Sequence, residues 1–441
     1  MAHLTYPTAY PDTKSRIRYA KMRPIQGFPL KLYTPRNNGS GQSATLRDSR
    51  PQPDRMHGLD TLRSVAILTV MAFHIYELHA ANTIPAVLLP AVRMCWMGVD
   101  LFFVLSGFLI GQQLLRPYAQ GRRPSLGTFY LKRFFRVLPV YAVVVTLYLA
   151  VPVWREAPHI APAWELLTFT ENLFVHYPYE RAFSPVWSLC VEEHFYLLLP
   201  LIVLIMTRKP SFARTAAAIA GFVLLGIGIR AFVLFHWLQP MARDGENWLG
   251  IYIKQIYYPT YSRLDGLLAG VTLAVLRTFR PAWWMALARR GHMLLAVGLP
   301  LVAAAMYLSV DRFTSVTGAA AAGVVFAFPL LSLGLGLIVA SALSQNGLLS
   351  RWRVPGAKMI ATLAYTLYLS HKGILHLTTV VFPSISNAGG IVWIALFAFA
   401  AFAASAVLYL LVERPFMLLR DKLLHQHAKP VERELRTEPA L

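Results

Sequence analysis

One apolar segment near the start of the chain holds two side chains that could do chemistry. Residues 58–78 read GLDTLRSVAILTVMAFHIYEL, with Arg63 and His74 eleven residues apart. Eleven residues make about three helical turns, so both side chains face the same way, roughly 16 Å apart along the axis. Ionisable groups inside a membrane span are costly and are candidates for function. Histidine, whose pKa is near neutral, is the usual general base, so His74 is the candidate base.

Both residues also have plainer interpretations. Arg63 could snorkel to the membrane interface from near a helix end. His74 could form a hydrogen bond between packed helices. Asp60 precedes Arg63 by three residues, a spacing that lets the two side chains pair on one helical face.

A second polar group lies in FYLKRFFRVLP, residues 129–139. Arg133 and Arg136 are three residues apart and share a helical face, with Lys132 beside them. Paired guanidinium groups suit phosphate recognition, because each presents a planar fork of donors. The same charges would also serve as an ordinary topology signal at the cytoplasmic face.

Two carboxylates, Glu192 and Glu193, begin another apolar run in SPVWSLCVEEHFYLLLP. Adjacent helical residues point about 100° apart, so one of them is expected to face the bundle interior. Glu192 could orient and charge-balance His74, as a carboxylate does in a catalytic triad. The alternative is a buried ion pair with an arginine of another helix, such as Arg230 or Arg263.

Other polar residues have weaker claims. The candidate cavity liners are Asp60, Asp265, His371 and Lys372, although each could be neutralised inside the bundle. Ser106 and Ser188 lack the Gly-x-Ser-x-Gly surroundings of a nucleophile elbow. Cys95 and Cys190, the two cysteines, give no metal-ligand spacing, so no metal site is predicted. Both fall near the predicted outer face, so a disulfide between them is conceivable.

The elements that would position these residues are transmembrane helices. Apolar residues make up 56% of the 441-residue chain and charged residues only 14%, whereas soluble domains carry about 25% charged residues. A span needs about 20 apolar residues. Ten stretches qualify, which predicts an all-α polytopic bundle: 59–79, 97–116, 137–153, 189–206, 215–236, 262–279, 293–309, 318–343, 357–382 and 390–413.

Charge supports this count. With both termini cytoplasmic, the loops rich in Lys and Arg all fall on the cytoplasmic side, as the positive-inside rule requires. Examples from successive cytoplasmic segments are Arg122 and Arg123, Arg208 and Lys209, Arg289 and Arg290, Arg351 and Arg353, and Lys422. Because one membrane face collects the positive charge, the net charge of +21 does not require a nucleic-acid partner.

The chain divides into three parts. Residues 1–55 are basic, rich in turn formers and without periodicity, so we expect a disordered tail. That tail could lie on anionic lipid headgroups or be passive. Residues 56–420 form the membrane domain, and residues 421–441 a short cytoplasmic tail.

Seven motifs together resemble one family. GLDTLRSVAILTVMAFH resembles the opening helix of the acyltransferase-3 membrane proteins, with its Arg-(ten residues)-His signature. FYLKRFFRVLPVY is similar to the family's Arg-x-x-Arg segment and WSLCVEEHFYLLLP to its Trp-Ser-Leu-x-x-Glu-x-x-Phe-Tyr motif. The remaining matches run in order to residue 416: GVDLFFVLSGFLI, SRLDGLLAG, LAYTLYLSH and VERPF.

The resemblance implies a membrane O-acyltransferase that moves an acyl group, usually acetyl, from acyl-CoA to a hydroxyl of an envelope glycan, lipid-linked sugar or similar acceptor. No permanently bound cofactor is implied, and the expected location is the bacterial inner membrane. About 25 residues follow VERPF, so a stand-alone form without a C-terminal hydrolase-like domain is expected. Arg63, Arg133 and Arg136 would then hold the acetyl-CoA phosphates on the cytoplasmic side, with His74 as base and Glu192 as its partner.

Two other functions fit parts of the pattern. Intramembrane charges also mark the substrate paths of transporters and lipid-linked-glycan flippases. No inverted repeat or pair of broken helices supports that interpretation. A binding or sensor protein could keep the fold without the chemistry, but the candidate catalytic residues are all present. Acceptor identity, acyl length and oligomeric state are left open by the sequence.

Overall fold

The computed structural model describes residues 56–424 except 178, 209–210 and 312. The predicted tails, 1–55 and most of 421–441, lie outside the described residues. Ten long helices coincide with the ten predicted spans: α1 (His57–Thr83), α3 (Gly98–Ala119), α4 (Leu126–Ala150), α6 (Val186–Arg208), α7 (Phe212–Val233), α10 (Asp265–Phe279), α12 (Gly291–Leu308), α13 (Gly318–Ala342), α15 (Ala357–Val381) and α17 (Gly390–Leu408). Over the described residues this confirms the all-α class.

Shorter elements connect or extend these helices. The short α-helices are α2 (Leu89–Arg93), α5 (Ala163–Leu167), α8 (Gln239–Arg243), α9 (Leu249–Tyr252), α11 (Pro281–Ala288), α14 (Leu348–Arg351) and α16 (Pro383–Ala388). The 3-10 turns are η1 (Ala86–Leu88), η2 (Met94–Met97), η3 (Pro152–Trp154), η4 (Glu171–Leu173) and η7 (Thr260–Ser262). The π-helical turns are η5 (Leu234–Leu238), η6 (Ile253–Tyr257) and η8 (Tyr409–Glu413). Two short parallel strands, β1 (His159–Ile160) and β2 (Glu180–Ala182), pair in one connecting segment.

Eight of the helices found in the described residues are long and apolar enough to cross a membrane by themselves. The two predicted spans outside that set are α10 and α15. Helix α10 is only 15 residues long. Helix α15 carries the buried polar run Ser370, His371 and Lys372, which lowers its hydropathy. Both are shielded by neighbouring helices, because α10 packs on α3 and α13 and α15 packs on α1 and α17.

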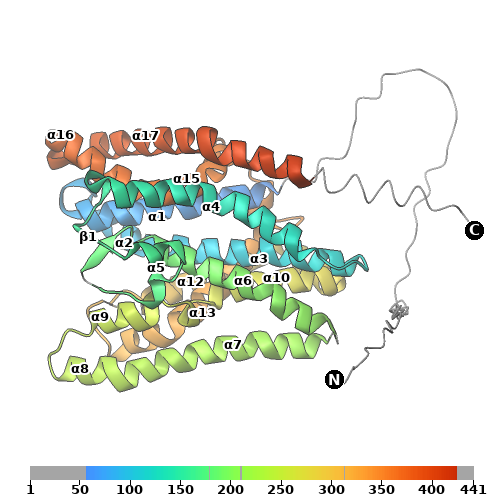
Figure 1. Ribbon diagram of the computed structural model, residues 1–441. Coiled ribbons are helices and arrows are strands. Elements are labelled where there is room, and N and C mark those ends of the chain that lie inside the picture. Colours follow the sequence, from blue (N-terminus) through green and yellow to red (C-terminus); the bar gives the residue numbers. More distant parts are fainter. Residues whose placement is uncertain (1–55, 178, 209–210, 312, 425–441) are drawn as a thin grey trace, which may run out of the picture. The chain divides into compact units, whose positions relative to one another are not determined.

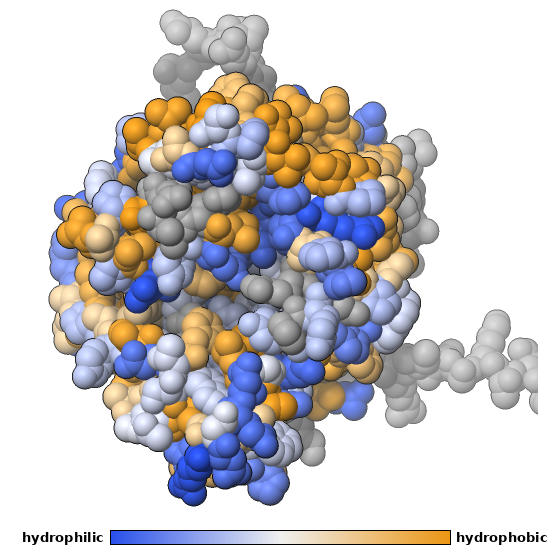
Figure 2. All heavy atoms as spheres, turned by 90° about the vertical axis from the view of Figure 1, so that its left-hand side faces the viewer, coloured by the Kyte–Doolittle hydropathy of each residue, from blue (hydrophilic) through white to orange (hydrophobic). Residues whose placement is uncertain are grey.

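The long helices lie side by side in one bundle, with α7 and α17 at opposite edges (Figure 1). The outward faces carry large exposed apolar side chains such as Phe232 and Ile391. In water such a surface would be unfavourable, whereas lipid is its natural solvent. Figure 2 views the end of the bundle that carries α8 and α16, where hydrophilic residues gather between apolar patches.

Two glycines explain how α3 and α10 approach so closely. A Cβ on Gly107 would lie 2.1 Å from the carbonyl oxygen of Leu267, and one on Gly270 would lie 2.2 Å from that of Val104. Small residues at such contacts let helix backbones meet in a membrane. The SGF and DGLLAG motifs therefore include the packing contacts that bring α3 against α10.

Two buried ion pairs sit in the same region. Arg230 of α7 contacts Asp265 of α10 at 2.7 Å, and Arg263 contacts Asp100 of α3 at 2.9 Å. All four side chains are almost fully buried. These pairs neutralise the charges that the helices bring into the core. The suggestion that Glu192 pairs with Arg230 or Arg263 is therefore wrong, since each arginine has an aspartate partner.

Candidate active site

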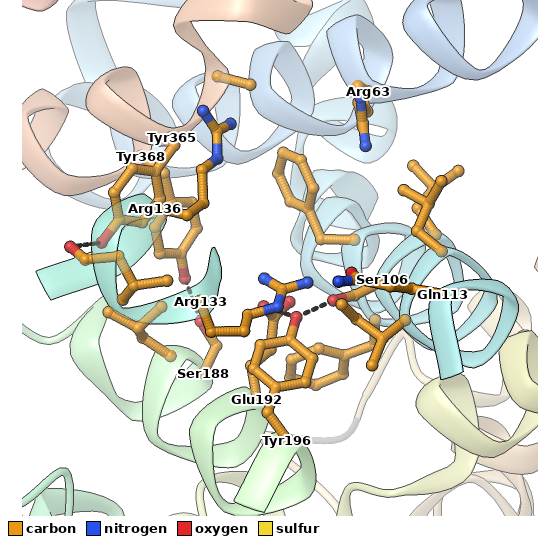
Figure 3. Close-up of a pocket in the computed structure, with 18 of the residues that line it drawn as sticks. Arg63, Ser106, Gln113, Arg133, Arg136, Ser188, Glu192, Tyr196, Tyr365 and Tyr368 are labelled. Atoms are coloured by element: carbon orange, nitrogen blue, oxygen red, sulfur yellow. Dashed lines mark hydrogen bonds between the residues drawn. The ribbon is translucent and has the colours of Figure 1, made fainter. Parts of the chain in front are cut away.

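A cavity of about 420 Å³ opens among α1, α3, α4, α6 and α15 (Figure 3). Its apolar wall includes Phe102 and Leu109. The charged lining is mostly positive: Arg63, Lys132, Arg133, Arg136 and Arg420, against the single carboxylate Glu192. A hollow with that balance attracts an anionic ligand and holds an apolar chain beside it.

Helix α4 presents three of these cations, Lys132, Arg133 and Arg136. It begins after Ser125, whose side chain accepts a hydrogen bond from the Thr128 amide at 3.2 Å and so caps the first turn. Arg133 and Arg136 follow two and three turns later on one face, as their spacing predicts. Figure 3 shows the Arg133 guanidinium in the middle of the lining residues and that of Arg136 at their edge, with Arg63 of α1 across from Arg133.

Arg133 is positioned by aromatic and polar groups of α6. Its guanidinium carbon lies 4.2 Å from the centre of the Tyr196 ring. The Tyr196 hydroxyl donates to Glu192 at 2.6 Å and also hydrogen-bonds Ser106. In the described part of the chain Arg133 forms no ion pair, so its donors remain available to a ligand while the cation–π contact fixes its plane.

Arg136 and Arg63 are held differently. Arg136 is ion-paired with Glu413, a fully buried carboxylate of the VERPF motif. Arg63 lies 4.0 Å from Asp60, which confirms the pairing predicted from their spacing. Asp60 itself does not line the cavity. Its predicted role as a liner is wrong, because the residue is buried within α1 beside its arginine partner.

His74 lies beyond this cavity, against a second histidine. Nδ1 of His74 is 3.0 Å from Nε2 of His371 and 3.0 Å from the Val70 carbonyl oxygen. Nδ1 of His371 is 2.8 Å from the Tyr368 carbonyl oxygen and 3.1 Å from that of Leu367. A carbonyl only accepts, so in the neutral pair each Nδ1 carries the proton. His371 Nε2 then accepts from His74, and the lone pair of His74 is left on Nε2.

The structure corrects three predictions. Glu192 does not orient His74: its hydrogen bond goes to Tyr196, in the cation-lined cavity. His371 does not line that cavity but holds His74 from behind. Asp265 is likewise not a cavity liner, because it is buried against Arg230. The catalytic role assigned to His74 stays a prediction.

Charged residues surround the histidine pair. Glu77 Oε2 lies 3.9 Å from His74 Nε2 and 3.9 Å from Lys372 Nζ. Lys372 also lies 3.5 Å from Glu156 and donates to the Ser184 hydroxyl at 2.7 Å. Lys372 is thus neutralised inside the bundle, one of the outcomes its sequence position allowed. Glu77 is the carboxylate nearest the free nitrogen of His74.

Tyr368 separates the cavity from the histidines. It lines the cavity and precedes His371 by three residues, with its ring 6.0 Å from that of His371. Its hydroxyl hydrogen-bonds Ser188 and donates to the Pro185 carbonyl at 3.1 Å. Phe102 packs edge-to-face against it at 6.0 Å. Neither Tyr368 nor Phe102 was predicted as a site residue, although they lie in the motifs LAYTLYLSH and GVDLFFVLSGFLI.

The two candidate serines form hydrogen bonds with tyrosines, and the two cysteines are not bonded to each other. Ser106 and Ser188 line the cavity, and each hydrogen-bonds a tyrosine rather than a histidine. They therefore lack the adjacent base that activates a serine nucleophile. Cys95 and Cys190 are both free thiols, so the conceivable disulfide is not formed.

The helices and the cavity define a multi-pass integral membrane protein with a cation-lined cavity near a histidine pair. The chain belongs to the acyltransferase-3 family: the family model described as an acyltransferase domain matches residues 56–410. The resemblance seen in the motifs is thereby confirmed.

Two curated relatives are O-acetyltransferases by name. The peptidoglycan O-acetyltransferase OatA of Listeria monocytogenes is 25% identical over 247 residues, which are 53% of this chain and 36% of the relative. The O-acetyltransferase OatA of Staphylococcus aureus is 26% identical over 236 residues, 50% of this chain and 35% of the relative. The aligned parts thus span about a third of each relative's length. No solved structure gives a significant match to the chain.

Proposed function

We propose that the protein transfers an acetyl group from cytoplasmic acetyl-CoA to a hydroxyl of a cell-envelope glycan, lipid-linked sugar or similar acceptor in the bacterial inner membrane. The observation that carries the proposal is the succession of a cation-lined cavity, the Tyr368 partition and the His74–His371 pair in one bundle. Family membership supports acyl transfer, and the names of the relatives support an O-acetyl product.

The donor fits the cavity by charge and reach. CoA carries phosphates at one end, which Arg63, Arg133 and Arg136 would bind through charge-assisted hydrogen bonds. Its pantetheine arm is an extended chain, suited to the apolar wall formed by residues such as Phe102 and Leu109. Arg63 and His74 lie roughly 16 Å apart along α1, a distance comparable to the length of that arm. The thioester would therefore reach Tyr368 and, past it, His74.

His74 would act as general base through Nε2. This nitrogen takes the proton of the acceptor hydroxyl while the hydroxyl oxygen bonds to the acyl carbon. The carbon–sulfur bond then breaks, and the imidazolium returns its proton to the CoA sulfur. Free CoA and the acyl ester are the products. His371 would keep the proton of His74 on Nδ1 and so hold Nε2 as the acceptor.

Reconstitution in proteoliposomes with radiolabelled acetyl-CoA and extracted envelope glycan or lipid-linked sugar tests the proposal. His74→Ala should lower the transfer rate by about 10²–10⁴-fold, the usual contribution of a general base, while CoA still binds. The matched control is His236→Ala, since His236 is exposed and lies away from the cavity. Wild-type rates in His74→Ala would refute the role of this residue.

Two outcomes would point to the other functions. Movement of a lipid-linked glycan across the vesicle without acetyl labelling would identify a transporter or flippase. CoA binding without turnover by the wild-type protein, with each acceptor class supplied, would identify a binding or sensor protein.

A further inference from the structure

A second cavity lies beside the first. It has a volume of about 560 Å³, and its polar lining includes Gln112, Arg116, Arg277 and Thr278. Leu109 and Gln113 of α3 line both cavities, so one wall is shared. We infer that this second cavity binds the phosphomonoester at the nucleotide end of the acyl donor, through Arg116 and Arg277. The inference rests on the proposed use of acyl-CoA.

The two arginines converge from different helices. Arg116 comes from the last turn of α3 and Arg277 from the last turn of α10. In the described part of the chain neither forms an ion pair with a carboxylate. Both side chains line the same cavity, so their like charges repel each other there. An anion placed between two such guanidinium groups relieves that repulsion and accepts hydrogen bonds from both.

The neighbouring contacts hold the site in place. Arg277 lies 5.8 Å from the centre of the Phe108 ring and 5.7 Å from that of Trp284. Gln112 donates to the Ala274 carbonyl at 3.0 Å and to the Thr278 hydroxyl at 3.1 Å, which ties α3 to α10 next to the arginines. These contacts hold Arg277 in place, whereas Arg116 is exposed and reaches the same cavity from the end of α3.

The chemistry of CoA matches a divided site. Its two linked phosphates join the pantetheine arm, and a separate phosphomonoester sits on its ribose. Arg63 and Arg133 of the first cavity are suited to the linked phosphates, because the apolar wall for the arm begins there. The ribose end would then pass the wall made by Leu109 and Gln113 into the second cavity. A phosphomonoester there presents three acceptor oxygens and nearly two negative charges.

Equilibrium binding of CoA and of 3′-dephospho-CoA to the full chain in zwitterionic phosphatidylcholine nanodiscs tests this inference. Wild-type protein should bind CoA about 10- to 100-fold more tightly than 3′-dephospho-CoA, as expected for one group of charge-assisted hydrogen bonds. Arg116→Gln and Arg277→Gln should each weaken CoA binding and leave 3′-dephospho-CoA binding unchanged. Each substitution should therefore reduce the ratio of the affinity for CoA to that for 3′-dephospho-CoA. Arg133→Gln should weaken both ligands equally and keep the ratio.

The matched control is Arg280→Gln, since Arg280 stacks on Phe212 near the end of α10 without lining either cavity. It should keep the wild-type ratio. The inference is overturned if the wild-type protein binds CoA and 3′-dephospho-CoA equally well, or binds neither. Equal binding would leave an anionic lipid headgroup as the ligand of the two arginines. Parallel acetyl-transfer assays test the proposed function separately. If the wild-type protein prefers CoA over 3′-dephospho-CoA but transfers no acetyl group, the phosphomonoester site is supported and the enzymatic function is refuted. If it transfers acetyl without that preference, the enzymatic function is supported and the phosphomonoester site is refuted.

Discussion

The imidazole of His371 lies against that of His74, with 3.0 Å between His371 Nε2 and His74 Nδ1. The two residues are 297 positions apart and belong to α15 and α1. Two backbone carbonyls fix the proton of His371 on its other nitrogen, so its only available role toward His74 in the neutral pair is that of acceptor. This places a histidine where a triad would hold a carboxylate.

The first prediction concerns that contact. His371→Leu should lower kcat of acetyl transfer by about 10- to 100-fold, comparable to the loss of a partner that orients a metal-ligating histidine. The KM for acetyl-CoA should stay near its wild-type value, because His371 lies outside the cation-lined cavity proposed to bind it. His371→Gln should restore part of kcat, since its amide oxygen can accept from His74 Nδ1. Steady-state kinetics in proteoliposomes provide the measurement, and equal kcat losses in the two variants would contradict the orienting role.

The second prediction concerns acyl length. Phe102 and Tyr368 both line the cavity and pack edge-to-face, and Tyr368 lies next to His371. Phe102→Ala should open space there, so kcat/KM for butyryl-CoA should rise about 10-fold relative to acetyl-CoA, in the range set by one or two methylenes in an apolar pocket. Competition between the two donors measures the ratio. Phe134→Ala is the control, because Phe134 is exposed on the same bundle and does not line the cavity.

The third prediction separates the two arginines of α4. Arg133→Gln should raise the KM for acetyl-CoA about tenfold, equivalent to one charge-assisted hydrogen bond, with little change in melting temperature. Arg136→Gln should also lower the melting temperature, because it leaves the fully buried Glu413 without its ion-pair partner. Adding Glu413→Gln should recover much of that stability but not the KM. Equal thermal stability of Arg133→Gln and Arg136→Gln would argue against a structural role for the Glu413 pair.

The fourth prediction tests the structural role of Asp265. Arg230→Met should destabilise the protein by about 3–5 kcal/mol, the usual cost of an uncompensated buried charge. The double variant Arg230→Met with Asp265→Leu should recover most of this loss, as apolar replacements of buried ion pairs often do. The folded double variant should keep the KM for acetyl-CoA, because neither residue lines the cation-lined cavity proposed to bind it. Thermal unfolding in detergent and kinetics on the same preparations check both parts.

Much of the fold follows from the sequence because lipid imposes a simple condition. Each crossing needs a long apolar run, and the ten predicted runs all coincide with helices of the described chain. Where α10 and α15 carry less apolar character than a lone span requires, neighbouring helices shield them. The contact between Asp60 and Arg63 was equally predictable, since residues three apart on a helix are neighbours.

The partners of the site residues were decided by the tertiary structure. Helical periodicity tells which side chains share a face, but not which face of another helix they meet. Glu192 and His74 both suited an interior position, yet α6 turns Glu192 toward Tyr196 and Ser106, whereas α15 brings His371 to His74. The sequence by itself therefore determined the spans, the charged ends and the family. Only the packing of helices distant in the chain decided which polar groups line the cation-lined cavity and which hold the histidine.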